Sequence, residues 1–404
     1  MGTSEASRRA VLAGVVAALV GFTSSFAVVL AGLRAVGASG PEAASGLLVL
    51  CVAQAVGMIV LSWRYRMPLT LAWSTPGAAM LAGAATTDGG WPAAVGAFAV
   101  TGLLIVATAA WPVLGRLVAR IPAPVAHAML AGVLLPLCLA PVHGLVTSPW
   151  MVAPVVLTWL VLLRVAPRWA VPAAFVVTMA VVGTWLARYG DALDGPLLPH
   201  LAWTTPALEW QAVVGIALPL YVVTMAAQNV PGVAVMASYG YAVPWRATMA
   251  TTGVGTLAGA AAGGHAVNLA AITAALAAGP EAGPDPRRRW LAAHTAGWAY
   301  LVIALLSTAL ATVVAAAPSG VVEAVAGLAL VGTLGASLHA ALTAPGGREP
   351  AVVTFVVAAS GVTVLGIGAA FWALVAGVVA HLVLAPRTPA PERAATSPSR
   401  RRVR

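Results

Sequence analysis

The stretch Leu71–Leu81, LAWSTPGAAML, lies in a long apolar part of the chain, yet it contains residues that interrupt a helix. Pro76 lacks the N–H that a continuous helix needs, and Gly77 costs about 1 kcal/mol relative to alanine. A hydroxyl residue followed by proline and glycine is typical of a helix start, with Thr75 at the N-cap and proline at the first helical position. We therefore expect extended backbone followed by a half-helix over residues 76–85, roughly 15 Å long.

The composition places the rest of the chain in a membrane as well. Of 404 residues, 61% are hydrophobic and 8% are charged, and the mean hydropathy is +0.95. No soluble fold of this length could bury so much apolar surface. Apolar runs of about 20 residues recur, whereas an outer-membrane barrel would show alternating strands of about 10 residues. The sequence predicts an all-α integral membrane protein.

The alternation of apolar runs and polar links predicts fourteen membrane segments. Their approximate ranges are 10–33, 43–62, 69–86, 92–112, 123–140, 149–164, 169–188, 210–231, 245–262, 265–279, 290–316, 321–342, 351–366 and 369–385. If the N-terminus is cytoplasmic, 19 of the 21 basic residues lie inside, and Arg34 and Arg188 are the two exceptions. This bias predicts that both termini are cytoplasmic. We expect the protein in a bacterial cytoplasmic (inner) membrane. A re-entrant hairpin in place of the last two segments would leave the same charge pattern.

A polar extracytoplasmic link at 189–209 divides the segments into two halves of seven. An odd number of segments per half means that the second half enters the membrane inverted. We therefore expect a first inverted repeat at 10–188 (spans 1–7) and a second at 210–386 (spans 8–14). Residues 1–9 form a cytoplasmic N-terminus and residues 387–404 an Arg-rich cytoplasmic tail.

The third span of the second half has a break that matches the first. Gly263 and Gly264 interrupt the helix, residues 265–267 can be extended, and Asn268 is a good N-cap for a half-helix that ends at Gly279. The two half-helix N-termini would meet near the midplane, each with unpaired N–H groups and about half a positive charge. One such break alone would favour a simple helix kink, but two in corresponding spans favour an anion site.

The distribution of charged side chains along the chain favours a site for an anion over a site for a cation. All eleven acidic residues lie in links or at span ends, which leaves no buried carboxylate for a cation or proton relay. The mid-span polar groups include Ser25 in span 1 and the pair Gln228 and Asn229 in span 8. The basic residues are scattered through links and the tail, so we expect a lipid bilayer and no nucleic acid as a partner. No catalytic motif lies within a span, so we expect no enzyme.

Three stretches resemble the signature sequences of the benzoate/proton symporter family (BenE type): PLTLAWSTPGAAML, AAQNVPGVAVMASYGY and GGHAVNLAAITAALAAGPEAGPDPRRRW. The resemblance implies a uracil-permease-like fold of seven plus seven inverted spans, with spans 1–4 and 8–11 as a core domain and the rest as a gate domain. It also implies uptake of benzoate, an aromatic carboxylate, with a proton. Dimers are common for this fold, so a homodimer is an expected assembly. Spans 8 and 10 of nucleobase relatives carry carboxylates, where this chain has Gln228 and Val267-Asn268.

The predicted transporter binds the substrate carboxylate between the two half-helix N-termini and moves its core domain against its gate. The predicted substrate-binding residues are Ser25, Trp73, Ser74, Thr75, Gly77, Tyr221, Gln228, Asn229, Gly264, His265 and Asn268. His265 is the proton-coupling candidate, and the alternative carrier is the substrate carboxyl itself. We expect no metal and no cofactor. A transporter of another small organic anion or a nucleobase, or an anion channel, are the alternatives.

Overall fold

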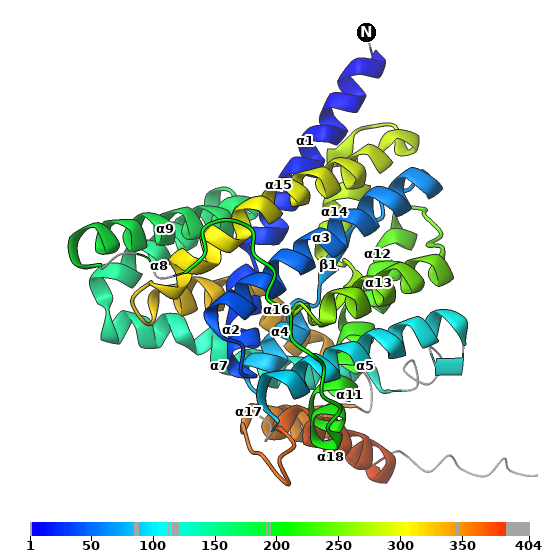
Figure 1. Ribbon diagram of the computed structural model, residues 1–404. Helices are drawn as coiled ribbons and strands as arrows, with labels where there is room; N and C mark the ends of the chain where they lie inside the picture. Colours follow the sequence, from blue (N-terminus) through cyan, green and yellow to red (C-terminus); the bar gives the residue numbers. More distant parts are fainter. Residues whose placement is uncertain are drawn as a thin grey trace, which may run out of the picture.

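Helices make up most of the protein in the computed structural model, which describes residues 2–84, 89–111, 113–114, 121–190, 193, 195–343 and 347–384. Figure 1 shows the helices packed around strand β1 (Leu71–Trp73), near the middle of the molecule. The predicted helical fold is confirmed, with one added two-stranded sheet. The predicted tail at 387–404 and the link residues Arg116 and Arg120 lie outside the described residues.

The helices described in the first half of the chain begin and end close to the predicted segments. They are α1 (Gly2–Thr23), α2 (Phe26–Ala35), α3 (Gly40–Tyr65), α4 (Thr75–Ala82), α5 (Gly90–Ala110), α7 (Ala123–Thr147), α8 (Pro149–Val165) and α9 (Ala170–Tyr189), with a 3-10 turn η1 (Pro167–Trp169).

The second half contains β2 (Val267–Leu269) and a further set of helices. They are α10 (Trp210–Ala212), α11 (Leu218–Thr224), α12 (Val230–Ser238), α13 (Trp245–Ala260), α14 (Ile272–Ala278), α15 (Trp290–Ala315), α16 (Val321–Thr343), α17 (Arg348–Ala359) and α18 (Ala369–Leu384), with π turns η2 (Val213–Ala217) and η3 (Met225–Asn229) and 3-10 turns η4 (Pro280–Ala282) and η5 (Pro286–Arg288).

Eight helical stretches in the described part of the chain are long and apolar enough to cross a membrane. They correspond to predicted spans 1, 2, 4, 5, 7, 8, 11 and 12. The other predicted spans contain shorter helices, and the 12 residues of α17 rise only about 18 Å against a hydrocarbon core of about 30 Å. The predicted segment 351–366 is wrong beyond Ala359, because Gly361, Leu365 and Gly366 adopt positive φ angles that end the helix.

Predicted spans 1 and 8 also depart from uniform helices. The first breaks at Ser24-Ser25, where the hydroxyls of both serines donate to the Gly21 carbonyl oxygen (3.1 and 3.3 Å). Such local bonds compete with the helix ladder, which explains why α1 ends at Thr23. The eighth span is continuous but contains the π turns η2 and η3. Single π turns inside helices are frequent at functional sites.

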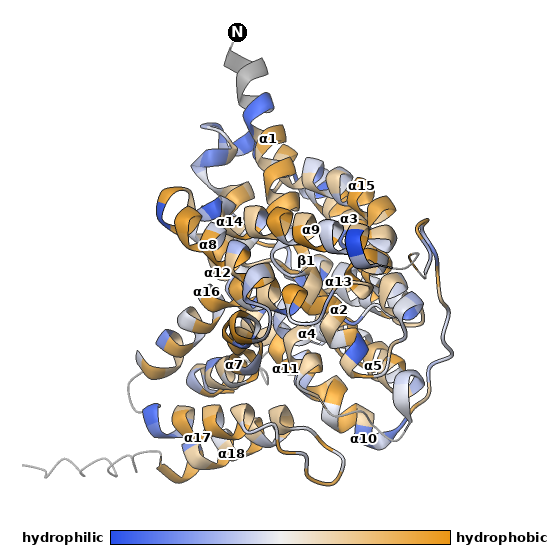
Figure 2. Ribbon diagram, turned by 90° about the vertical axis from the view of Figure 1, so that its left-hand side faces the viewer, coloured by the Kyte–Doolittle hydropathy of each residue, from blue (hydrophilic) through white to orange (hydrophobic). Residues whose placement is uncertain are grey.

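Long-range helix pairs surround the short sheet. α3 packs along α15 and α5 along α13, while α7 contacts both α16 and α17. Figure 2 shows hydrophobic residues along most of the helices and the most hydrophilic residues mainly near helix ends and in loops, and many large hydrophobic side chains are exposed, such as Trp63, Leu103 and Leu306. Apolar side chains on the outside and a close-packed interior are the arrangement of a protein whose solvent is lipid.

One close helix contact lies between α2 and α4, where a glycine lets two backbones touch. A Cβ atom on Gly32 would overlap the carbonyl oxygen of Ala78, whereas a Cβ atom on Gly183 in α9 would meet open space. Small residues at helix contacts are the usual device for close approach in membranes.

We therefore predict that Gly32→Ala lowers the unfolding free energy by about 1–3 kcal/mol, the usual range for overpacking. The change is measurable as a lower melting temperature of the purified protein in detergent. Gly183→Ala is the matched control and should leave that temperature unchanged or raise it, because alanine is favoured over glycine by about 1 kcal/mol in a helix and the added methyl group meets open space. Equal melting temperatures for the two variants would contradict the α2–α4 contact.

Candidate functional site

Strands β1 and β2 cross as an antiparallel pair in the interior. Leu71 pairs with Leu269, Ala72 with Asn268, and Trp73 with Val267. The ladder continues at both ends, since Ser74 N donates to Ala266 O (2.9 Å) and Ala270 N donates to Thr70 O (3.0 Å). Extended backbone inside a membrane requires such partners, so each strand supplies the hydrogen bonds that the other lacks.

Helix α4 begins directly after β1, as predicted, but its cap is Ser74 and not Thr75. The Ser74 Oγ accepts hydrogen bonds from Gly77 N (3.1 Å) and from Thr224 Oγ1 (2.8 Å). Pro76 has no N–H, and Ala78 N donates to Ser74 O (2.8 Å). The start of α4 is therefore largely satisfied within the protein, which leaves fewer free N–H groups than expected.

Asn268 is not the cap of the second half-helix, so this part of the prediction is wrong. It lies in the middle of β2, where its Nδ2 donates to Leu269 O (3.0 Å) and its Oδ1 is buried without a partner in the described residues. Helix α14 begins only at Ile272, with Ala271 as an N-cap that has no side-chain hydrogen bond. Strand pairing delays the helix because it holds residues 267–269 extended.

A small cavity of about 50 Å³ lies where the two strands end and the half-helices begin. Its walls come from α1, β1, α4, η3, α14 and α15. The lining residues are Gly21, Ser24, Ser25, Ala72, Trp73, Thr75, Gln228, Ala270, Ala271, Thr273 and Tyr300. Four of the eleven predicted binding residues are among them: Ser25, Trp73, Thr75 and Gln228.

The cavity presents polar groups whose hydrogen bonds are unused. The side chains of Thr75, Gln228, Thr273 and Tyr300 line it, and none of them forms a side-chain hydrogen bond within the described part of the chain. No charged side chain is among the lining residues. Pockets of this kind, with a few convergent polar groups on apolar walls, are the usual form of a small-molecule site.

Aromatic rings form one wall of this cavity. Trp73 is 2% exposed, and its ring makes edge contacts with Phe22 (5.8 Å between centroids) and Tyr300 (6.1 Å). The indole Nε1 donates to Ser25 Oγ (2.8 Å), which fixes the ring beside the cavity. Edge-to-face contacts of this length stabilise a fixed arrangement of rings. Such a wall can pack against a flat apolar ligand.

Ser24, Thr273 and Tyr300 are the lining residues with side-chain hydroxyls that the predicted binding set lacks, and the Ser24 hydroxyl already donates to Gly21 O. A tyrosine in the middle of apolar span 11 was the available signal for Tyr300, because a buried hydroxyl requires a partner. A Cβ atom on Gly21 would lie 2.7 Å from the Tyr300 hydroxyl, so α1 approaches the cavity through a glycine. Thr273 carried no comparable signal, since threonine in a membrane helix usually bonds its own backbone.

Several predicted residues hold the fold around the cavity and do not line it. Asn229 Oδ1 accepts from Leu269 N (2.8 Å), which attaches η3 to β2. The Tyr221 hydroxyl is bonded to Thr108 Oγ1 (2.6 Å), on the side of α5. Ser74, Gly77 and Gly264 are likewise outside the lining: the first caps α4, and the two glycines pack against Leu220 and against Val49 and Gly259.

His265 is fully buried and is not among the lining residues. Its ring packs edge-on against Phe98 of α5, with centroids 6.3 Å apart. Neither ring nitrogen has a hydrogen-bond partner in the described residues. The next residue, Ala266, accepts a hydrogen bond from Ser74 N, so the backbone at His265 lies close to the start of α4.

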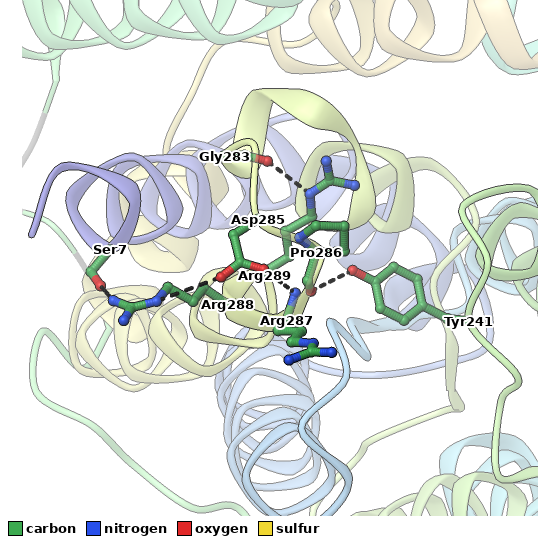
Figure 3. Close-up of polar contacts among 8 residues, drawn as sticks. All are labelled: Ser7, Tyr241, Gly283, Asp285, Pro286, Arg287, Arg288 and Arg289. Carbon is green, nitrogen blue, oxygen red and sulfur yellow. Dashed lines mark hydrogen bonds and ion pairs between the residues drawn. The ribbon is translucent and has the colours of Figure 1, made fainter. Parts of the chain in front are cut away.

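The far end of α14 is fixed by a cluster of arginines, shown in Figure 3. Arg289 is 8% exposed and donates to Ala278 O (2.7 Å), at the end of α14, and to Gly283 O (2.9 Å). Arg288 Nη1 donates to Ser7 Oγ (3.0 Å), and its Nε forms an ion pair with Asp285 (3.7 Å). A cation at a helix C-terminus is stabilising, so this cluster holds α14 at the end opposite the cavity.

Tyr241 belongs to the same cluster and donates to Pro286 O (2.8 Å) from the α12–α13 loop. Burial raises the pKa of its phenol, which keeps it a neutral donor, although nearby Arg289 acts in the opposite direction. No group of three metal-ligating side chains lies within the described ranges.

A protein-family comparison matches nearly the whole chain. The family model described as BenE, benzoate membrane transport protein, matches residues 4–383. Inner membrane protein YdcO of Escherichia coli (strain K12) is 39% identical over 380 residues, which cover 92% of this chain and 95% of the relative. The benzoate membrane transport protein of Acinetobacter baylyi (strain ATCC 33305 / BD413 / ADP1) is 27% identical over 378 residues, with coverages of 94% and 95%.

Solved structures share the fold at low sequence identity. SLC26A9 superimposes with a TM-score of 0.65 at 12% identity and covers 93% of this chain, which spans 64% of the length of that structure. The transmembrane domain of the cyanobacterial bicarbonate transporter BicA gives a TM-score of 0.58 at 16% identity, with 93% and 96% of the two chains covered. At these identities the likeness concerns the fold alone.

Alanine substitutions at the neighbours Gln228 and Asn229 should change the unfolding free energy by different amounts. Asn229→Ala removes the buried acceptor of Leu269 N, so we expect a loss of about 1–3 kcal/mol of unfolding free energy. Gln228→Ala removes a side chain without a hydrogen bond and should change stability by less than about 0.5 kcal/mol. Thermal unfolding in detergent measures both. Equal destabilisation by the two variants would contradict the assignment of one residue to the scaffold and the other to the cavity.

Proposed function

Because the chain belongs to the benzoate membrane transport protein family (BenE), we propose that it is a secondary active transporter that imports benzoate or a related aromatic carboxylate by proton symport. The observation that carries this proposal is the central cavity. It combines an aromatic wall at Trp73 with unused hydrogen-bonding groups at Thr75, Gln228 and Tyr300. An aromatic acid needs both, since its ring is apolar and its carboxyl group must be hydrogen-bonded when buried.

Transport requires the cavity to change size. Its volume of about 50 Å³ is far below the roughly 300–1,000 Å³ of ordinary ligand pockets, so an aromatic acid fits only after the walls separate. The walls include η3, and a π turn can rearrange into an α turn with a small shift of the backbone. We propose alternating access, in which the elements that carry the cavity move against their neighbours.

The moving parts of this proposal are the two predicted domains. The core consists of α1–α5 with α10–α15, and the gate of α7–α9 with α16–α18. The inverted repeat at 10–188 and 210–386 is supported by paired contacts: α3 packs on α15 just as α13, its counterpart, packs on α5. It is also supported by the antiparallel crossing of β1 and β2. Fourteen membrane segments, cytoplasmic termini and a homodimer in the inner membrane complete the proposal.

We propose that the proton travels on the substrate carboxyl group. No charged side chain lines the cavity, so a bare carboxylate there would lose its hydration without gaining a counter-ion. An imidazolium at His265 would be equally costly, because the buried ring has no partner in the described residues and packs on Phe98. The neutral acid is the species that suits this site.

Uptake of radiolabelled benzoate into proteoliposomes tests the function and the site together. We expect an acid-outside pH gradient to drive benzoate accumulation against the concentration gradient of benzoate, and we expect an uncoupler to abolish that accumulation. Gln228→Ala should lower uptake at subsaturating benzoate about tenfold, equivalent to one lost hydrogen bond of ~1.4 kcal/mol. Asn268→Ala should also lower uptake, since Asn268 pairs with the cavity residue Ala72.

The matched control is Gln211→Ala, which removes a glutamine that is not among the cavity-lining residues. Wild-type rates for Gln228→Ala and Asn268→Ala would refute the site. Competition by related carboxylates and by nucleobases separates the alternative substrates. Equilibration without accumulation would indicate an anion channel in place of a symporter.

His265→Gln separates the two proton routes. If the proton travels on the substrate, this variant retains pH-driven accumulation of benzoate, because glutamine keeps the position polar but cannot titrate. The measurement is the accumulation ratio with and without an imposed pH gradient, at matched protein content. Loss of accumulation with retained exchange of benzoate for benzoate would assign the proton to His265 instead.

A further inference from the structure

A second cavity, of about 260 Å³, lies between α2 and α16 and has a composition unlike the central one. Its walls are aliphatic, with contributions from α2, α7, α15 and α16. Arg34 and Glu323 are its only charged lining residues. It is about five times as large as the central cavity and approaches the size of ordinary small-molecule pockets.

The guanidinium of Arg34 is available for a ligand. Within the described residues it forms neither an ion pair nor a hydrogen bond, although it feels the charge of Glu323. The Glu323 carboxylate is engaged elsewhere, since its Oε2 accepts from Gly320 N (2.8 Å) at the start of α16. The start of α16 offsets part of the negative charge of Glu323, whereas the positive charge of Arg34 has no such partner within the described residues.

Arg34 also departs from the charge pattern of the chain. The predicted topology places 19 of the 21 basic residues on the cytoplasmic side of the membrane. Arg34 and Arg188 are the two on the extracytoplasmic side. Arg34 lies at the opposite end of the α1–α2 stretch from Ser7, which contacts Arg288. Basic residues orient a membrane protein from the cytoplasmic side, so Arg34 does not contribute to orientation. A role in ligand binding is consistent with its position.

The two cavities lie along the same helix. Ser25, at the start of α2, lines the central cavity, while Ala27, Val28 and Arg34 line the outer one. Arg34 lies nine positions after Ser25, which corresponds to a helical rise of about 14 Å. A ligand in the outer cavity is thus only a short distance from the central site. The outer cavity lies between the elements proposed as core and gate.

We propose that the outer cavity is a first binding station for the anionic form of the aromatic carboxylate, with Arg34 as its carboxylate-binding residue and the aliphatic walls as its ring-binding surface. Guanidinium and carboxylate match in planar, bidentate geometry, which makes arginine the best side chain for this role. The inference rests on the proposed function. It adds to it a division of labour: the anion binds at Arg34, and the neutral acid occupies the charge-free central cavity.

The test measures benzoate uptake kinetics separately from each face, in right-side-out and inside-out membrane vesicles. Arg34→Gln should raise the KM about tenfold for benzoate offered from the face where α2 ends, with little change in the saturated rate. The KM from the opposite face should stay unchanged. Arg188→Gln is the matched control, because Arg188 is the other basic residue of that face, is exposed and lies outside the cavity.

Glu323→Gln supplies a second variant of opposite sign. Glutamine preserves a side-chain acceptor for Gly320 N but removes the repelling charge, so the KM from the same face should fall about two- to threefold. Increasing salt should weaken the uptake of wild type at low benzoate more than that of Arg34→Gln, since only the former attracts the anion.

Three results would overturn the inference. These are a KM for Arg34→Gln equal to that of Arg188→Gln, an equal rise from both faces, or a rise in KM for Glu323→Gln. If Arg34→Gln fails to reach the membrane, the sign of the Glu323→Gln effect decides. Absence of benzoate uptake by wild type would instead refute the proposed function, and a normal wild type with an unaffected Arg34→Gln would refute the outer site alone.

Discussion

The antiparallel pairing of β1 and β2 is the interaction on which the rest of the architecture depends. Extended backbone in the interior of a membrane protein is tolerated only if its N–H and C=O groups are bonded. The pair achieves this mutually, and side chains from outside complete it: Thr256 Oγ1 accepts from Val267 N (2.9 Å) and Asn229 accepts from Leu269 N. Both half-helices therefore begin at fixed points, and the cavity lies at those points.

This arrangement explains why the central site is polar but uncharged. The cap at Ser74 and the strand ladder use most of the local backbone donors, so the cavity depends on side chains such as Gln228 and Tyr300. An uncharged site suits a neutral acid, whereas Arg34 at the other end of α2 suits the anion. The proposed change in protonation between the two cavities would couple the proton to the substrate without a buried titratable relay.

The sequence predicted the parts of the fold that local chemistry determines. Pro76 and Gly77 identified the break, because proline is excluded from helix interiors, and α4 begins where they indicate. The helix caps were predicted wrongly because they depend on contacts between residues far apart in the sequence. Asn268 resembles a helix cap locally, but the pairing of Val267 with Trp73, almost 200 residues away, holds it in a strand. Ser74 and not Thr75 caps α4, and its hydroxyl also accepts from Thr224, a long-range contact that no local pattern reveals.

The central claim is that an aromatic acid occupies the space between the ends of β1 and β2. A structure of the protein with benzoate bound, determined in lipid nanodiscs, tests it most directly. The account predicts ligand density against the Trp73 ring, with the carboxyl group within hydrogen-bonding distance of Thr75, Gln228 or Tyr300, in a cavity wider than the present one. Density confined to another part of the protein, with this cavity closed and empty at saturating benzoate, would contradict it.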